Sequence, residues 1–169
     1  MARNKTMGIR HCFDGGNVVY HLESGEKFTA LHELIHKASV FTGIRDREAF
    51  EESVISREKL QSTGFGHGVA VAHGRSNDLS SVLIGLGVSR DGIPYGSPDG
   101  EPVRLLFLIA SPQKTNLDYL QALSTLVRVI RDCSLREILL SALDAEEIEK
   151  TIRSAFSFSL ERIACSPAT

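Results

Sequence analysis

The stretch 62-STGFGHGVAVAHGR-75 places three glycines and a histidine before four small apolar residues, and a second histidine, a glycine and an arginine follow at once. Closely spaced glycines mark a turn, because they adopt backbone conformations that other residues avoid. The apolar run 69–72 is typical of a short buried strand. The stretch therefore predicts a glycine-rich turn at 63–68 and a strand 69–72 that has His73 at its end.

Helical and strand patterns flank this stretch on both sides. The two apolar runs that follow it are joined by an exposed Gly- and Pro-rich connection without a helix, which predicts an antiparallel pair. The order of elements predicts one α/β domain in which helices cover a sheet. The other expected elements are a strand at 18–22, helices at 25–41 and from Asp46, strands at 81–88 and 103–110, and helices at 117–130, at 134–142 and from the capping-box pair Asp144 and Glu147.

Bulk composition excludes several classes of function. A chain of 169 residues supports one well-buried core. The net charge of -2 and pI of about 6.3 indicate no nucleic-acid partner, and no apolar run reaches the roughly 20 residues that membrane insertion needs. The N-terminus lacks the apolar stretch of a secretory signal. The odd number of scattered cysteines favours reduced thiols in a cytoplasmic protein, with no catalytic role for Cys12, Cys133 or Cys165.

A five-residue match to H-E-x-x-H, a zinc-hydrolase pattern, occurs at 32–36. At helical spacing His32 and His36 fall on the rim of the apolar stripe formed by Leu31, Ile35 and Ala38. A third ligand could come from Glu51, Glu52 or Glu58. The short match is common by chance, so a solvated helix flank is favoured and no metal is assigned; a zinc hydrolase remains a remote alternative.

His73 has the surroundings of a phosphate acceptor. Gly68 before the strand and Gly74 after His73 leave the backbone bare, and bare N–H groups can bind an anion. Arg75 adds a guanidinium, which matches phosphate oxygens. A histidine among such donors can hold a phosphoryl group without a metal or cofactor.

The run R-E-x4-T-G-F-G-H-G-V-A-V-A-H-G-R at 57–75 resembles the active-site segment of phosphotransferase-system enzyme IIA domains of the fructose/mannitol type, which includes the nitrogen-regulatory IIA proteins. The similarity extends over about 18–155. It implies a three-layer α/β/α sandwich with a mixed parallel/antiparallel sheet, in which His73 is phosphorylated and Arg57 lies beside it. It also implies that Arg75 contacts either the phosphate or a partner, and that His67 positions the loop.

Two positions depart from the family pattern. Ala72 stands where proline usually precedes the active histidine. Tyr119 stands where a second histidine is usual, and it either donates a hydrogen bond to the phosphoryl group or packs at the helix start. Residues 1–17 are expected to be an N-terminal extension, 18–156 the enzyme IIA-like domain, and 157–169 a C-terminal tail or helix extension.

The resemblance implies a cytoplasmic phosphoryl carrier that receives phosphate from phospho-HPr. A nitrogen-regulatory role, in which phosphorylation changes the affinity for a regulated protein, is favoured by Tyr119 and by the lack of an attached IIB or membrane segment. The alternative is a sugar-uptake component that passes phosphate to a cysteine of a IIB domain.

Overall fold

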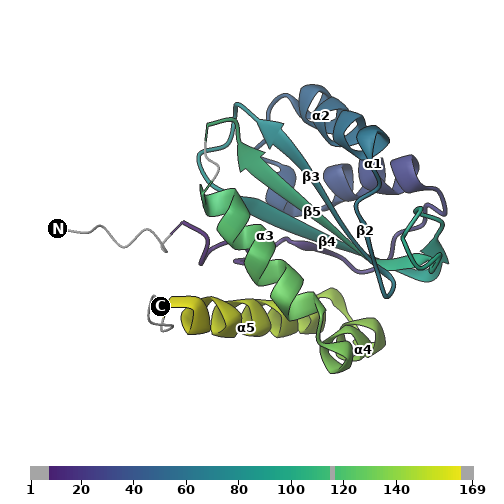
Figure 1. Ribbon diagram of the computed structural model, residues 1–169. Helices are drawn as coiled ribbons and strands as arrows, with labels where there is room; N and C mark the ends of the chain where they lie inside the picture. The colour runs from purple at the N-terminus through teal and green to yellow at the C-terminus, as the bar shows by residue number, and fades with distance from the viewer. Residues whose placement is uncertain (1–7, 115–116, 165–169) are drawn as a thin grey trace.

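A five-stranded mixed sheet forms the centre of the computed structural model, which describes residues 8–114 and 117–164 (Figure 1). The strand order is β1-β4-β5-β3-β2, with β1 parallel to β4, β4 antiparallel to β5, β5 parallel to β3 and β3 antiparallel to β2. The predicted antiparallel pair is therefore confirmed. The strands are β1 (Val18–Val19), β2 (Gly64–Gly66), β3 (Val69–Ser76), β4 (Leu83–Ile93) and β5 (Val103–Pro112).

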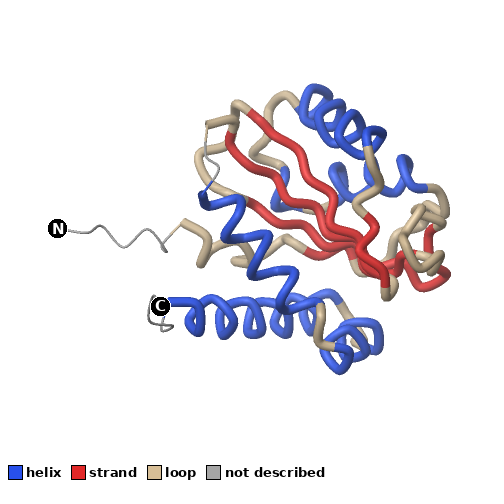
Figure 2. The backbone as a smooth tube through the Cα atoms, in the orientation of Figure 1, coloured by secondary structure: helices blue, strands red, loops and turns tan. Residues whose placement is uncertain are grey.

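Helices cover both faces of this sheet and make three layers (Figures 1 and 2). One apolar core lies under α1 and α2, and the second lies under α3, α4 and α5. This arrangement confirms the predicted fold class. The helices are α1 (Lys27–Lys37), the 3-10 helix η2 (Ser39–Phe41), α2 (Arg47–Leu60), α3 (Leu117–Ile130), α4 (Cys133–Ser141) and α5 (Ala145–Ala164).

Side-chain caps begin several helices as the sequence indicates. The Asp46 carboxylate accepts the Ala49 N–H at 3.0 Å and starts α2. The Asp144 carboxylate accepts the Glu147 N–H at 2.8 Å before α5. The Glu147 carboxylate in turn accepts the N–H of Leu143 rather than that of Asp144, so the capping box is shifted by one residue.

Several predicted boundaries are wrong. The strand expected at 69–72 continues to Ser76 because β5 pairs with it along its whole length. The strand expected at 81–88 begins at Leu83 and, after a bulge, continues to Ile93, which pairs with Val103. The strand expected at 18–22 ends at Val19, although the Leu22 N–H still donates to the Val88 carbonyl at 2.7 Å.

The segment before β1 contributes to the core. Ile9, Cys12 and Phe13 are buried, and the Phe13 ring packs edge-on against Phe156 of α5 with centroids 5.3 Å apart. The Cys12 thiol is buried as well, and burial raises its pKa to about 12, which makes it a poor nucleophile. Cys165 and the outer ends of the predicted extension and tail lie outside the described residues.

Within 8–114 and 117–164, no helix is long and apolar enough to cross a membrane.

Candidate active site

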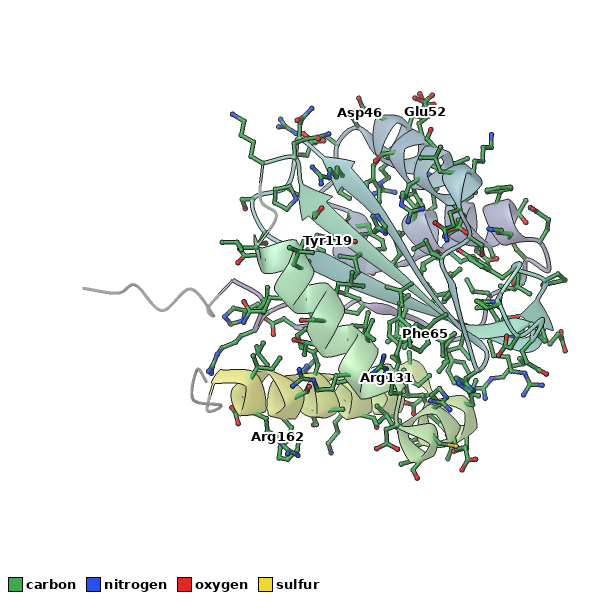
Figure 3. The ribbon with its side chains drawn as sticks, in the orientation of Figure 1. Asp46, Glu52, Phe65, Tyr119, Arg131 and Arg162 are labelled. Carbon is green, nitrogen blue, oxygen red and sulfur yellow. The ribbon has the colours of Figure 1, made fainter. Side chains whose placement is uncertain are left out.

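His73 lies inside β3, with its side chain on the face of the sheet that α3 covers. Val71 belongs to the core on that face, whereas Ala72 belongs to the core under α2. Because successive side chains of a strand point to opposite faces, His73 shares the face of Val71. Tyr119 lies in the first turn of α3 (Figure 3). Its ring lies 5.4 Å from the His73 imidazole, centroid to centroid. The structure thus brings together two of the predicted site residues.

Two arginines supply positive charge to this pair. Burial lowers the pKa of His73 below its ordinary value of 6.5, and the charges of Arg57 and Arg75 lower it further, against the opposing charge of Glu58. Burial raises the pKa of Tyr119, and the same two guanidinium groups oppose that shift. The site at neutral pH therefore holds a neutral imidazole with a lone pair, a neutral phenol and two fixed cations.

Local hydrogen bonds hold the arginines near the edge of β3. Arg57 comes from the last turns of α2, and its Nη1 donates to the Gln61 carbonyl at 3.0 Å. Arg75 follows His73 by two residues in β3, and its Nη1 donates to the Gln113 carbonyl at 3.2 Å. The two guanidinium groups that lower the pKa of His73 therefore come from different elements.

The same edge of β3 presents main-chain donors. The Val71 N–H donates to the Thr63 carbonyl at 3.1 Å, and the Arg75 N–H donates to Ser53 Oγ at 3.0 Å. Both groups point away from β5, so the two-residue repeat of the strand directs the His73 N–H toward this edge as well. An anion at the imidazole would have this amide near it.

Glu58 is a site-supporting residue whose role the sequence analysis missed. Its buried carboxylate pairs with Lys27 Nζ of α1 at 2.6 Å and accepts the Thr63 N–H at 2.9 Å and the Thr63 hydroxyl. These contacts tie the end of α2, where Arg57 lies, to α1 and to the start of β2. The spacing from Glu58 to Thr63 was a visible signal, whereas nothing in the sequence links Glu58 to Lys27.

The structure does not bring His67 and Gly68 to His73. Both residues form the tip of the β2–β3 hairpin with positive φ, 55° and 74°, and the His67 N–H donates to Asp99 Oδ2 at 2.8 Å. Val69 and His73 are four residue steps apart along the strand, roughly 13 Å at about 3.3 Å per step. The glycines here allow a tight hairpin turn, and the anion-binding loop expected from them does not lie beside the histidine.

Gly74 serves helix packing. A Cβ on Gly74 would lie 2.5 Å from Val54 Cγ2 and 3.2 Å from the Val54 backbone nitrogen, so any side chain would push α2 away. Ala70 and Ala72 lie on the same face of β3 and are buried under α2. The alternation of small residues thus lets α2 lie close to the strand that carries His73.

The H-E-x-x-H segment lies on α1, where His32 and His36 are exposed as the helical spacing predicts. Glu33, the residue that hydrolase chemistry would need as a base, is buried and accepts the N–H groups of Glu23 and Ser24 at 2.9 Å each. Burial opposes ionisation, but these bonds and one from Lys37 lower the pKa of Glu33 to about 2. The Glu33 carboxylate thus binds the loop before α1. Because it is engaged in this way and is not placed as a base, the zinc-hydrolase alternative is not supported.

The fold and the site together define a class of protein. The model of the family described as "Phosphoenolpyruvate-dependent sugar phosphotransferase system, EIIA 2" matches residues 11–155. The chain therefore belongs to this family of IIA-type phosphoryl carriers, and the resemblance inferred from the 57–75 segment is confirmed.

Relatives of two kinds are similar to this chain. A nitrogen regulatory protein of Bradyrhizobium diazoefficiens is 38% identical over 128 residues, which cover 75% of this chain and 82% of the relative. The fructose-specific EIIABC component of Bacillus subtilis is 34% identical over 136 residues, 80% of this chain but 21% of that longer protein. Among solved structures, the nitrogen regulatory protein IIA-Ntr of Neisseria meningitidis aligns with a TM-score of 0.69 and 30% identity, over 83% of this chain and 93% of that one.

Proposed function

We propose that the chain is a cytoplasmic phosphoryl carrier that accepts its phosphoryl group on His73 from phospho-HPr. An imidazole nitrogen of His73 attacks phosphorus, the bond from phosphorus to the donor's histidine nitrogen breaks, and the donor imidazole leaves with the bonding electron pair. Arg57, Arg75 and the His73 amide at the edge of β3 stabilise the charge on the transferred group. Positioning and charge stabilisation are what phosphoryl transfer requires of a protein.

The observation that supports this proposal best is the contact of the Tyr119 ring with a partly exposed imidazole, whose pKa is lowered by burial and by the charges of Arg57 and Arg75. Two exposed leucines of α3 flank Tyr119 in the sequence: Leu117 is 64% exposed and Leu120 is 55% exposed. We call these two residues the α3 rim. Exposed apolar side chains beside a reactive group suit a surface that docks a donor protein and then an acceptor protein.

We favour a nitrogen-regulatory role over sugar uptake. A neutral phenol at Tyr119 gives a phosphorylated His73 less charge stabilisation than a second histidine would, and the Bradyrhizobium relative bears a regulatory name. A phosphate at His73 adds about two negative charges next to the α3 rim, enough to change the affinity of a partner. The second candidate is transfer to a IIB domain, and the Bacillus relative supports it because its name joins A, B and C components.

Phosphate mapping tests the acceptor. Tag-free protein is incubated with phosphoenolpyruvate, enzyme I and HPr, and the acid-labile phosphate is located by mass spectrometry. We expect label on His73, complete loss of label in His73→Ala and full labelling in His67→Gln. Label that survives His73→Ala but disappears in His67→Gln would show that His73 is not the acceptor.

A chase experiment separates the two roles. The phosphorylated protein is mixed with candidate IIB domains, and the label remaining on the chain is followed over time. Slow loss is expected for a regulatory protein. Rapid transfer to a IIB cysteine would contradict the regulatory role and support sugar uptake.

A further inference from the structure

Three side chains with metal-ligand chemistry meet on the outer side of the α1–α2 layer, away from His73. His32 Nδ1 lies 2.9 Å from Glu51 Oε1, and His36 Nε2 lies 3.2 Å from Glu51 Oε2. The two imidazole rings are 4.3 Å apart, centroid to centroid. One potential ligand atom from each residue lies within 4.8 Å of the other two. The H-E-x-x-H segment thus finds in Glu51 the third ligand that its own glutamate does not provide.

The geometry fits a four-coordinate ion. Zinc ligand bonds of about 2.0–2.2 Å in a tetrahedron place neighbouring ligand atoms about 3.3–3.6 Å apart. The two nitrogen-to-oxygen distances here, 2.9 and 3.2 Å, are a few tenths of an ångström shorter, and the three ligand atoms lie within 4.8 Å of one another, so an ion between them requires the two pairs to open slightly. Two residues one helical turn apart on α1 and one residue of α2 make up the set, and both helices are held by the core beneath them.

The site is open to solvent on its remaining side. Both histidines are exposed, and the three ligands line a surface hollow together with Glu48, Glu52 and Ile55. Glu52 points away from the sheet on the outer side of α2 (Figure 3). A water molecule can therefore complete the coordination, and two extra carboxylates make the hollow attractive to a dication.

We propose that His32, His36 and Glu51 bind one Zn²⁺ ion, which clips α1 to α2. Two imidazoles and one carboxylate are a ligand set that suits zinc, whereas magnesium and calcium prefer oxygen ligands alone. Glu33 is held by backbone N–H groups and supplies no base for hydrolysis, so the role that we assign to the ion is to link the two helices. Because α2 packs on Gly74 of β3, the clip stiffens the helix that carries Arg57.

Zinc binding to the tag-free full chain tests the proposal, with a colorimetric chelator as competitor. We expect about one equivalent of Zn²⁺ at micromolar free zinc and a rise in the midpoint of thermal unfolding as zinc is added. His36→Ala and Glu51→Gln should each raise the dissociation constant at least about tenfold, since losing even a supporting partner of a ligand costs that much.

Matched controls separate coordination from general attraction. His21→Ala removes an exposed histidine elsewhere, Cys133→Ser removes an exposed thiol, and Glu52→Gln removes a charge from the same hollow; each should leave the dissociation constant within about threefold. The proposal is overturned if the wild-type chain binds no zinc in this range. It is also overturned if Glu52→Gln costs as much as Glu51→Gln, or if His36→Ala binds normally, since the contacts would then be ion pairs without a metal.

Discussion

The protonation state of His73 follows from the groups around its ring. Burial and the charges of Arg57 and Arg75 all disfavour the imidazolium, and Glu58 alone among the named groups favours it. A neutral imidazole is the nucleophile that phosphoryl transfer needs. In the function that we propose, the arginines would have two effects, since they favour the deprotonated imidazole and would also stabilise the phosphate that it receives.

Removing one arginine should move the titration of His73. In Arg57→Ala we expect the pKa of His73 to rise toward 6.5, because one of the charges that lower it is gone. The initial rate of loading from phospho-HPr should fall by about tenfold or more at pH 7, since a charge contact to the phosphate is lost. NMR titration of the His73 ring measures the first effect; an unchanged or lower pKa would contradict the electrostatic account.

The lowered pKa of His73 in the folded chain makes the free energy of unfolding depend on pH. The unfolded chain binds a proton at His73 near pH 6.5, whereas the folded chain resists protonation until lower pH. His73 therefore lowers the free energy of unfolding as the pH falls through 6.5, and its effect levels off below the folded pKa. Denaturant unfolding of the wild type and His73→Gln between pH 5 and 8 measures this effect. The free energy of unfolding should fall less in the variant than in the wild type as the pH is lowered.

If His73 is the acceptor that we propose, Tyr119 is the residue at which we expect onward transfer to change. Tyr119→His restores the imidazole usual in the family at 5.4 Å from His73, where it can carry positive charge and donate a charged hydrogen bond to the phosphate. We expect the rate of transfer to an added IIB domain to rise several-fold. Tyr119→Phe, the matched control, keeps the ring and removes the hydroxyl, and it should not raise that rate; equal rates in both variants would exclude a role for charge.

Glu58 links three elements through one carboxylate. Glu58→Gln leaves the Lys27 ammonium without its counter-charge and weakens the contacts to Thr63. Breaking a buried pair typically costs about 3 kcal/mol or more, and we expect a loss of that order in the free energy of unfolding. Urea unfolding measures it, with the exposed Glu52→Gln on the same helix as control; equal midpoints for the two variants would show that the pair contributes nothing.

The packing of α2 on β3 depends on the absence of a side chain at one position. Gly74→Ala places a Cβ against Val54, and overpacking of this kind costs about 1–3 kcal/mol. Val54→Ala removes the methyl groups that collide with it. The double variant should therefore be more stable than the sum of the two single effects predicts, by about 1 kcal/mol in a double-mutant cycle. Additive effects would mean that the contact between α2 and the strand is not tight at this point.

The molecule as a whole has two cores, one on each side of the sheet, and the core under α3 and α5 includes the chain before β1. Besides the ring contact of Phe13 with Phe156, Arg153 Nε of α5 donates to the Phe13 carbonyl at 2.5 Å. The segment next to β1 is therefore part of the folded unit, although the proposed domain division at 17/18 stays a prediction.

Phe13→Ala tests that integration. Truncating a fully buried phenylalanine costs about 3–5 kcal/mol, so the free energy of unfolding should fall by roughly that amount. Labelling of His73 should persist at low temperature, because the imidazole lies on a different part of the sheet. Phe158→Ala, at an exposed position of α5, should change the stability little; a similar loss in both variants would contradict a specific role for Phe13.

The order of elements and the identity of the central residues were predictable because they rest on local patterns. Periodicity located the long helices and the β4–β5 pair, and the resemblance of the 57–75 segment to the family's active-site segment pointed to His73 and Arg57 as site residues. Strand ends were less predictable, since the pairing of β3 with β5, and not the residues of β3 alone, extends that strand to Ser76. The position of His67 was unpredictable for the same reason, because its distance from His73 depends on the direction in which the hairpin runs.

The sequence by itself determined the fold class, the family and the acceptor histidine that we propose, because alternation, helical spacing and a motif of contiguous residues are local properties of the chain. Only the tertiary structure decided which distant groups meet. It joined Lys27 to Glu58, Tyr119 to His73 and Glu51 to the two histidines of α1, and it placed His67 at the hairpin tip, where its N–H donates to Asp99. Such contacts depend on how helices pack over a sheet, and that packing is set by the whole core rather than by the spacing of the residues that meet.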